Sequence, residues 1–249
     1  MSHPLLEHVF DIRPHEVDTR GRLRPVTLLA YMQNVASEHA TQLGVSVRNL
    51  QSSGLTWVMS RVHLLMERYP RSGEFITIRT WPVTREGLFS IRDFELLDGT
   101  GERIGAATTS WAALDLVSRR PVRLNERLPH YPLRPVRALE DSFATLPVLA
   151  NPQTRLCLPV LRSDLDLNQH VNNTVYAGWG LEAAPQSVAD RCQPIEIEIG
   201  FRAEAYYGDS IVSLCAAESE DGLCLLHRIE NSASGLEVAR LRTHWKPVG

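Results

Sequence analysis

Apolar residues recur at helical spacing in two parts of the chain. In residues 27–43 they fall on one face of a helix, and Gly44 follows as a typical helix terminator. In residues 172–185 they recur every four positions, and Pro185 ends the run. This second segment is rich in glycine and alanine, which lets a helix lie very close to a sheet. The pattern therefore predicts two helices, the second one closely wrapped by strands.

Strand-like runs separated by turn signals fill most of the remaining sequence. The predicted strands are 8–17, 57–68, 74–83, 88–97 and 103–116 in the first half, and 155–161, 195–205, 210–217, 223–230 and 237–245 in the second. In each half one strand precedes the helix and the others follow it. One helix followed by a run of antiparallel strands indicates an α+β fold in which a sheet curls around that helix.

The second half repeats the element order of the first, which indicates an internal duplication. Two short matches without gaps support it, namely Asp18, Arg22 and Leu23 with Asp166, His170 and Val171, and residues 73–76 with residues 208–211. The first half keeps the aspartate but has arginine where the second half has histidine. The duplication therefore predicts one competent site and one degenerate copy.

The segment between the halves, residues 119–152, is rich in proline and shows little periodicity, which is typical of an interdomain linker. We therefore predict three parts, a first repeat at 1–118, this linker, and a second repeat at 153–249. The linker begins with an excess of positive charge that includes Arg119, Arg120 and Arg123. Such a cluster can dock an acidic partner, and a solvated linker is the simpler alternative.

The overall composition excludes several classes of protein. With 249 residues, 43% of them hydrophobic, and a formal net charge of -3, the chain is an ordinary globular protein without the basic signature of nucleic-acid binding. No apolar run is long enough for a membrane helix, and no basic-then-apolar leader follows the first methionine, so we expect a cytoplasmic protein that binds no membrane. The scattered cysteines Cys157, Cys192, Cys215 and Cys224 lack CxxC spacing and predict buried free thiols rather than disulfides or a zinc site.

The strongest chemical signal lies just before the second helix, where the sequence reads DLDLNQHVNN. Asp166, Asn168 and His170 are the candidate catalytic residues, because the amino end of a helix stabilises negative charge that develops on a reacting carbonyl oxygen. His170 can act as a base or orient the carbonyl, Asn168 can hold a water, and Asp166 can fix its neighbours or share the proton. Glu204, in a predicted strand, is a further candidate base whose pKa partial burial would raise.

Each of these residues also has a simpler interpretation. Asp166, Asn168 and Asn172 can be turn formers or helix caps, and His170 or Glu204 alone can be a surface charge. Only their density at one helix start favours a joint catalytic role. His39 is interpreted as a satisfied core histidine. The sequence contains no GxSxG elbow, no phosphate-binding glycine loop and no dinucleotide fingerprint.

The sequence resembles the acyl-acyl carrier protein thioesterases, the plastid enzymes of plants and their bacterial relatives. LDLNQHVNNTVYAGWGLEAAP and GFRAEAYYGDSI are similar to the family's two signatures, and the resemblance extends from about His8 to Trp245. It implies a double hotdog fold, in which each half is a long helix wrapped by a curved antiparallel sheet. It also implies that the family's catalytic Asp, Asn, His and Glu are Asp166, Asn168, His170 and Glu204.

The resemblance further implies hydrolysis of fatty acyl-acyl carrier protein to free fatty acid and holo carrier protein, without a metal or organic cofactor. Ala205 stands where many plant members have cysteine, which argues against a covalent cysteine intermediate and for attack by water with Glu204 or His170 as the base. Chain-length selectivity is attributed to the first repeat, and Arg119, Arg120 and Arg123 would dock the acidic carrier protein. The residues expected to contact substrate are Met32, Trp57, Met59, Asn172 and Asn173, of which the first three are interpreted primarily as core.

Three rival functions remain at this stage. An acyl-coenzyme A thioesterase would use the same chemistry, a hotdog module could bind acyl ligands without turnover, and a hotdog dehydratase is the weakest alternative. The sequence leaves open the acyl length, saturation and branching, the choice between the two carriers, and whether two chains form a homodimer.

Overall fold

The computed structural model describes residues 3–248, and the chain divides into two compact units, with the boundary between Phe143 and Ala144. The first unit contains β1 (Leu6–Asp11), a 3-10 turn (Pro14–Glu16), α1 (Pro25–Gln42), α2 (Val47–Gln51), β2 (Leu55–Met66), β3 (Phe75–Glu86), β4 (Phe89–Asp98), β5 (Arg103–Asp115) and α3 (Leu124–Arg127). The second contains β6 (Thr154–Pro159), a 3-10 turn (Arg162–Asp164), α4 (Asn173–Glu182), α5 (Gln186–Ala189), β7 (Cys192–Phe201), β8 (Ser210–Ala217), β9 (Cys224–Asn231) and β10 (Glu237–Pro247).

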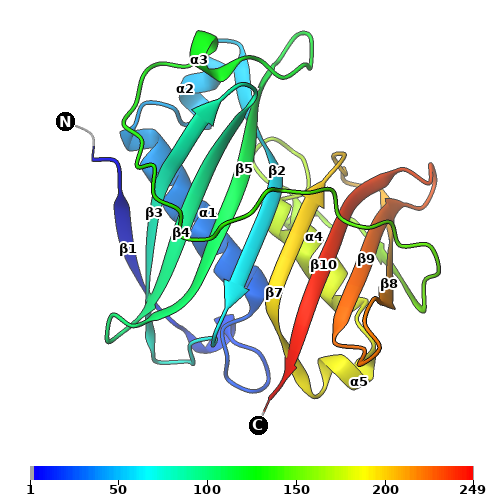
Figure 1. The fold of residues 1–249 in the computed structure, drawn as a ribbon. Coiled ribbons are helices and arrows are strands. Elements are labelled where there is room, and N and C mark those ends of the chain that lie inside the picture. Colours follow the sequence, from blue (N-terminus) through cyan, green and yellow to red (C-terminus); the bar gives the residue numbers. More distant parts are fainter. Residues whose placement is uncertain (1–2, 249) are drawn as a thin grey trace. The chain divides into compact units, whose positions relative to one another are not determined.

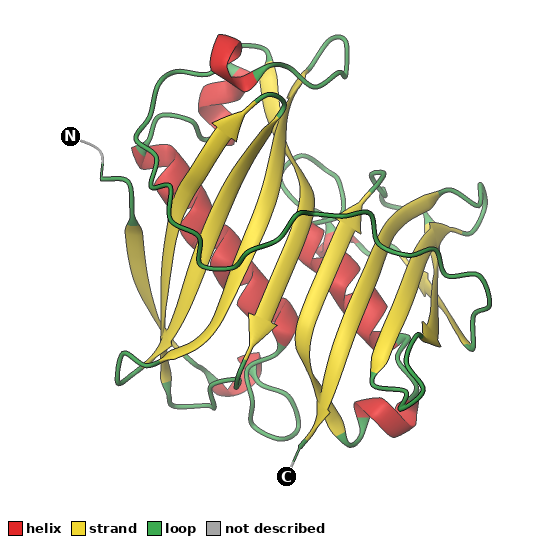
Figure 2. Ribbon diagram, in the orientation of Figure 1, coloured by secondary structure: helices red, strands yellow, loops and turns green. Residues whose placement is uncertain are grey.

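The two units share one topology (Figures 1 and 2). The strands of the first lie in the order β1-β3-β4-β5-β2, and those of the second in the order β7-β10-β9-β8-β6, which is the same order read from the opposite edge. All pairings within each unit are antiparallel. In each unit one strand precedes the main helix and four follow it, which confirms the predicted duplication.

Helix α1 forms where the sequence predicted it. Pro25 occupies the first helical turn, where its missing N–H costs nothing, and Gly44, at φ +73, follows the carboxyl end. The residues that α1 buries recur at three- and four-residue spacing and are Leu28, Leu29, Met32, Val35, Ala36 and His39. This apolar stripe packs the helix onto its own sheet.

Helix α4 depends on its small residues. A Cβ built on Gly180 would lie 2.7 Å from Leu241 Cδ2 on β10, so a larger residue would force the helix or the leucine to move. Asn172 caps the amino end by accepting from the backbone N–H of Thr174 at 2.9 Å. The helix ends at Glu182, and Pro185 is the N-cap of the short α5. The predicted close approach of helix and sheet is confirmed.

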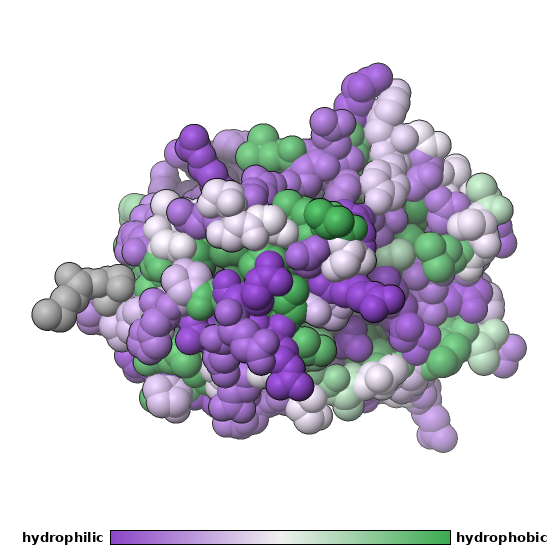
Figure 3. All heavy atoms as spheres, turned by 90° about the horizontal axis from the view of Figure 1, so that it is seen from above, coloured by the Kyte–Doolittle hydropathy of each residue, from purple (hydrophilic) through white to green (hydrophobic). Residues whose placement is uncertain are grey.

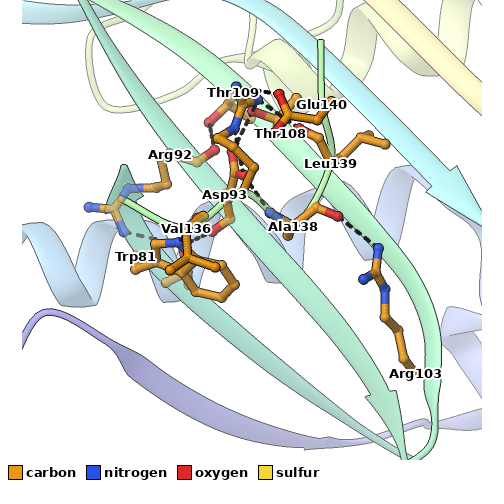
Figure 4. Close-up of polar contacts among 12 residues, drawn as sticks. Trp81, Arg92, Asp93, Arg103, Thr108, Thr109, Val136, Ala138, Leu139 and Glu140 are labelled. Carbon is orange, nitrogen blue, oxygen red and sulfur yellow. Dashed lines mark hydrogen bonds and ion pairs between the residues drawn. The ribbon is translucent and has the colours of Figure 1, made fainter. Parts of the chain in front are cut away.

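The proline-rich segment 119–152 is not a separate linker but is divided between the two units. Residues 119–143 fall in the first unit and 144–152 in the second. Figure 4 shows how the first part is held. The buried Asp93 carboxylate of β4 accepts from Arg137 Nε at 3.0 Å and from Ala138 N at 2.8 Å, while Trp81 Nε1 donates to Val136 O at 2.7 Å. Adjacent residues of a strand point to opposite faces of the sheet, and Arg92, next to Asp93, contacts His39 of α1. The segment that Asp93 binds therefore crosses the face of the sheet that α1 does not cover.

Two expectations about single residues need correction. Cys192, Cys215 and Cys224 are buried free thiols as expected, but Cys157 is exposed. Exposed and partly buried side chains alternate along β6, and Cys157 lies on its exposed face. Glu204 is not on a strand. Strand β7 ends at Phe201, and the amides of Arg202 and Ala203 both bond the Val238 carbonyl, at 2.9 and 3.2 Å, which breaks the ladder with β10.

The surface carries scattered apolar groups. On the face shown in Figure 3, green apolar side chains alternate with purple hydrophilic ones. Within residues 3–248, no helix has the length and apolar character required to cross a membrane.

Candidate active site

A tight turn places His170 in front of α4. Asp166 Oδ1 accepts from the backbone N–H of Asn168 at 2.8 Å and lies 3.4 Å from that of His170, and the backbone N–H of Asp166 bonds the His170 carbonyl at 2.8 Å. Gln169 has φ +63, the left-handed conformation that lets the chain close on itself. The turn is therefore held by a local aspartate and directs the chain into the helix.

Glu204 lies in the loop after β7 and meets this turn. His170 Nδ1 is 3.2 Å from Glu204 Oε1, so the structure brings together the two candidate bases from separate loops. Their side chains are 29% and 34% exposed, which leaves both within reach of water and of a ligand. The Tyr206 hydroxyl donates to the other carboxylate oxygen, Glu204 Oε2, at 2.7 Å.

The Glu204 loop is fixed from both sides. The backbone N–H of Val171 bonds the Ala205 carbonyl at 3.0 Å, and His170 and Tyr206 form an isolated antiparallel bridge. From α4, the hydroxyl of buried Tyr176 accepts from the backbone N–H of Ala205 at 3.0 Å. Burial raises the pKa of Tyr176 to about 12, so this hydroxyl stays protonated in neutral solution.

The amino end of α4 offers one free backbone donor. Asn172 Oδ1 accepts from both the N–H and the hydroxyl of Thr174, at 2.9 Å each, so this side chain is occupied as a cap. The N–H of Asn173, the first residue of the helix, has no protein acceptor among residues 3–248. Together with the helix dipole, it can stabilise negative charge on an oxygen placed there.

Other predicted site residues lie outside this contact network. The Asn168 side chain is exposed, and Asp166 meets the backbone of the turn rather than the imidazole. Met32 and Met59 are buried in the first unit, and Trp57 there donates from Nε1 to the Val45 carbonyl at 2.8 Å. A substrate contact for these residues stays a prediction. The predicted docking residues Arg119, Arg120 and Arg123 are all exposed, on the connection between β5 and α3.

Sequence reasoning missed Tyr206 and Tyr176. The pair of tyrosines directly after FRAEA was a visible signal, because aromatic hydroxyls next to a candidate glutamate can bind it. Nothing local showed which of them reaches the carboxylate. Tyr176 looked like an ordinary core residue of the helix, since its contact is with the backbone of a distant loop.

The first unit contains the same turn without the same chemistry. Asp18 Oδ1 accepts from the backbone N–H groups of Arg20 and Arg22 at 2.9 Å each, and the Asp18 N–H bonds the Arg22 carbonyl. Gly21, at φ +75, occupies the position of Gln169. Arg22 therefore stands where the second unit has His170, as the sequence predicted.

The counterpart of Glu204 follows from the pairing of the two loops. In the first unit the backbone N–H of Leu23 bonds the Pro70 carbonyl, and in the second unit that of Val171 bonds the Ala205 carbonyl. Pro70 therefore corresponds to Ala205, and the residue before it, Tyr69, corresponds to Glu204. Tyr69 is buried, and burial raises its pKa well above the usual range, so it offers no carboxylate and no ionised group. The first unit thus lacks both members of the pair.

Comparison with known proteins places this arrangement in a family. The model of the acyl-ACP (acyl carrier protein) thioesterase N-terminal domain matches residues 5–130, and that of the C-terminal domain matches residues 150–247. The chain belongs to the acyl-ACP thioesterase family. It is 30% identical to oleoyl-acyl carrier protein thioesterase 1 of Arabidopsis thaliana over 270 residues, which cover 95% of this chain and 75% of the relative. It is 27% identical to the acyl-[acyl-carrier-protein] hydrolase FATB1 of Cuphea viscosissima, over 96% of this chain and 61% of the relative.

Solved structures agree with the assignment. An acyl-ACP thioesterase from Bacteroides thetaiotaomicron matches with a TM-score of 0.85 and 26% identity, covering 97% of this chain and 98% of the other. The 12:0-ACP thioesterase from Umbellularia californica matches with a TM-score of 0.85 and 23% identity over 100% and 99% of the two chains, which supports the fold. The thioesterase therefore has the expected double hotdog fold, and it is a thioester hydrolase.

Proposed function

We propose that His170 and Glu204 form the catalytic centre at which this enzyme hydrolyses the thioester of a fatty acyl-acyl carrier protein to free fatty acid and holo carrier protein. The observation that carries the assignment is the 3.2 Å separation of His170 Nδ1 and Glu204 Oε1 beside the amino end of α4. Only the second unit has this pair, so one site serves the whole chain.

The geometry favours His170 as the base. Because a carboxylate oxygen is the neighbour of Nδ1, we assign the ring proton to Nδ1, which leaves the lone pair on Nε2. Both Glu204 oxygens already have partners, His170 on one side and Tyr206 on the other. Glu204 accordingly fixes the tautomer of His170 and stabilises the imidazolium that forms, as the carboxylate of a catalytic triad does.

The reaction then proceeds in two steps. His170 Nε2 removes a proton from water while the water oxygen bonds the thioester carbon, and the carbonyl oxygen becomes an oxyanion. The Asn173 N–H and the dipole of α4 stabilise that charge. The carbon–sulfur bond then breaks, and the leaving thiolate takes the proton from Nε2. A thiol has a pKa of about 8.5, so this second step needs little acid assistance.

The proposal is tested by measuring free fatty acid released from purified acyl-acyl carrier protein. His170→Ala and Glu204→Gln should each lower kcat by roughly 10²- to 10⁴-fold, the usual contribution of a positioned base. His130→Ala and Glu220→Gln change the same residue types at exposed positions and serve as controls, with turnover expected to match the unchanged enzyme. Wild-type turnover in both site variants would refute the assignment.

We also propose that the exposed arginines Arg119, Arg120 and Arg123 dock the carrier protein. Arg123 has a side chain that is 74% exposed, with Glu126 at 4.0 Å as a weak ion-pair partner. An acidic carrier would gain from this local positive charge, whereas coenzyme A would gain less because it presents a much smaller charged surface. The two relatives named above, an oleoyl-acyl carrier protein thioesterase and an acyl-[acyl-carrier-protein] hydrolase, support the same choice of carrier.

A cytoplasmic location belongs to the proposal as well, and the homodimer, which the sequence leaves open, is a second point to test. The four free cysteines fit a reducing compartment. Fractionation of cells expressing the enzyme tests the first, with recovery in the membrane fraction counting against it. Light scattering at several protein concentrations tests the second, and a constant monomer mass would exclude the dimer.

A further inference from the structure

Tyr206 touches both members of the proposed catalytic pair. Its hydroxyl donates to Glu204 Oε2 at 2.7 Å, and its ring meets the His170 ring edge to face, with centroids 5.0 Å apart and an interplanar angle of 84°. We infer that Tyr206 is a positioning residue, whose hydroxyl holds the Glu204 carboxylate in the orientation that faces His170. This inference rests on the proposed roles of His170 and Glu204.

The division of the carboxylate is the first reason. Glu204 Oε1 faces His170 at 3.2 Å and Oε2 accepts from Tyr206, so each oxygen has its own partner. A glutamate side chain that is one-third exposed would otherwise sample several rotamers, and only some of them bring an oxygen to the imidazole. A hydrogen bond to a charged group is stronger than one between neutral groups, so the Tyr206 hydroxyl favours the one Glu204 rotamer that it contacts.

The position of Tyr206 is itself fixed, although the residue is 44% exposed. Its backbone N–H donates to Asp209 Oδ2 at 2.9 Å, and its backbone forms the antiparallel bridge with His170. Tyr176 holds the preceding residue from α4 through the bond to the Ala205 N–H. The backbone that carries the Tyr206 side chain is therefore held by several hydrogen bonds, and this fixes the direction from which the Tyr206 hydroxyl reaches Glu204.

The degenerate copy gives an independent argument. In the first unit, Arg22 occupies the position of His170 and Tyr69 that of Glu204. Arg71 occupies the position of Tyr206, because its backbone forms a bridge with Arg22 as that of Tyr206 does with His170. All three side chains of the second unit's contact group are thus replaced. The turn aspartate, Asp18, is kept in the same contacts. The histidine, glutamate and tyrosine therefore differ between the units as a set, whereas the residue that shapes the turn does not.

The test is Tyr206→Phe, which removes one oxygen and keeps the ring. The control is Tyr207→Phe, because Tyr207 is also exposed and its ring lies under Arg162, with the guanidinium carbon 4.1 Å from the ring centroid. Tyr206→Phe should lower kcat roughly 10- to 150-fold, the loss of one hydrogen bond to a charged group, with KM changed less than about twofold. Tyr207→Phe should leave both constants unchanged.

The pH profile separates positioning from mere structural support. The titratable groups that contact or flank Glu204 within the second unit are His170, Tyr206, Tyr176, Asp209 and Asp166. Losing the Tyr206 donor leaves more negative charge on the Glu204 oxygen that faces His170, and this charge stabilises the protonated imidazole. The acid limb of kcat/KM should therefore move to higher pH in Tyr206→Phe and stay in place in Tyr207→Phe.

The outcomes distinguish this inference from the proposed function. If His170→Ala and Glu204→Gln are inactive but Tyr206→Phe keeps the wild-type kcat and pH profile, the catalytic pair stands and the role of Tyr206 is refuted. If all three variants turn over normally, the site itself is wrong. A Tyr206→Phe enzyme with a lower thermal midpoint and an unmoved acid limb would show a structural contact only, which also refutes the positioning role.

Discussion

His170 Nδ1 lies 3.2 Å from Glu204 Oε1, although one residue precedes α4 and the other follows β7. The contact exists because the ladder between β7 and β10 ends at Phe201 and the chain then turns to pair with the residues in front of α4. A strand that continued straight would have carried the carboxylate past the histidine. The break in the sheet is thus what assembles the proposed centre.

The first prediction concerns the coupling of this pair. If Glu204 acts through His170, removing both side chains costs no more than removing His170 alone. We expect the double variant His170→Ala, Glu204→Gln to have the kcat of His170→Ala within about threefold, measured under single-turnover conditions. Multiplicative losses would show that the two residues act independently and would favour Glu204 as a separate base.

The second prediction compares the two turn aspartates. Asp166 and Asp18 hold equivalent turns through one carboxylate oxygen, so alanine at either position should lower the free energy of unfolding by about 1–2 kcal/mol, read from urea denaturation. Only Asp166→Ala should also lower kcat, by tenfold or more, because its turn carries His170. Asp166→Asn keeps an acceptor oxygen and should recover most of both losses. An inactive, stable Asp166→Asn would show that the charge itself is needed.

The third prediction tests the docking surface. Reversing the charge at Arg119, Arg120 or Arg123 to glutamate should raise KM for acyl-acyl carrier protein several-fold and leave the KM for the same acyl chain on coenzyme A nearly unchanged. The effect should shrink as salt is added, because exposed charges are screened. Arg191→Glu, an equal change at an exposed position of the second unit, is the control. Equal losses with both carriers would remove the case for docking here.

The fourth prediction concerns two buried histidines. His39 donates from Nε2 to the His3 carbonyl at 3.0 Å and accepts at Nδ1 from Arg92 Nη1 at 3.1 Å, and His227 Nε2 lies 2.8 Å from Thr243 Oγ1. Burial lowers the pKa of each to about 4, and the charge of Arg92 adds to the effect on His39. Both histidines are therefore neutral in the folded protein at neutral pH.

The sign of the pH dependence follows from linkage. The unfolded chain binds these protons at about pH 6.5, whereas the folded chain binds them only near pH 4, so the stability they provide is complete above about 6.5 and is lost as the pH falls towards 4. His39→Gln and His227→Gln cannot titrate, and the slope of their unfolding free energy between pH 4 and 6.5 should be smaller than that of the unchanged enzyme. His130→Gln, at an exposed position, should keep the full slope. Unchanged slopes in both buried variants would contradict the prediction.

Local physics explains why much of the fold was predictable. The stripe from Leu28 to His39 requires only the helical period, and His39 was recognisable as a satisfied core residue because it lies on that stripe. The cap at Asn172 and the small residues of α4 are equally local signals. The path of residues 119–143 was not predictable in this way, since it depends on the buried Asp93 accepting from Arg137 and Ala138 far along the chain.

The sequence by itself determined the two helices, the order of the strands along the chain, the duplication and the identity of His170 and Glu204 as candidates. These features depend on spacing, on turn residues and on chemical type, all of which are read from neighbouring positions. Only the tertiary structure decided that Glu204 lies in a loop, that its carboxylate is shared between His170 and Tyr206, and that Tyr176 braces the loop. Those contacts depend on where the β7 ladder breaks and on how far each side chain then reaches, which is set by packing between segments distant in sequence.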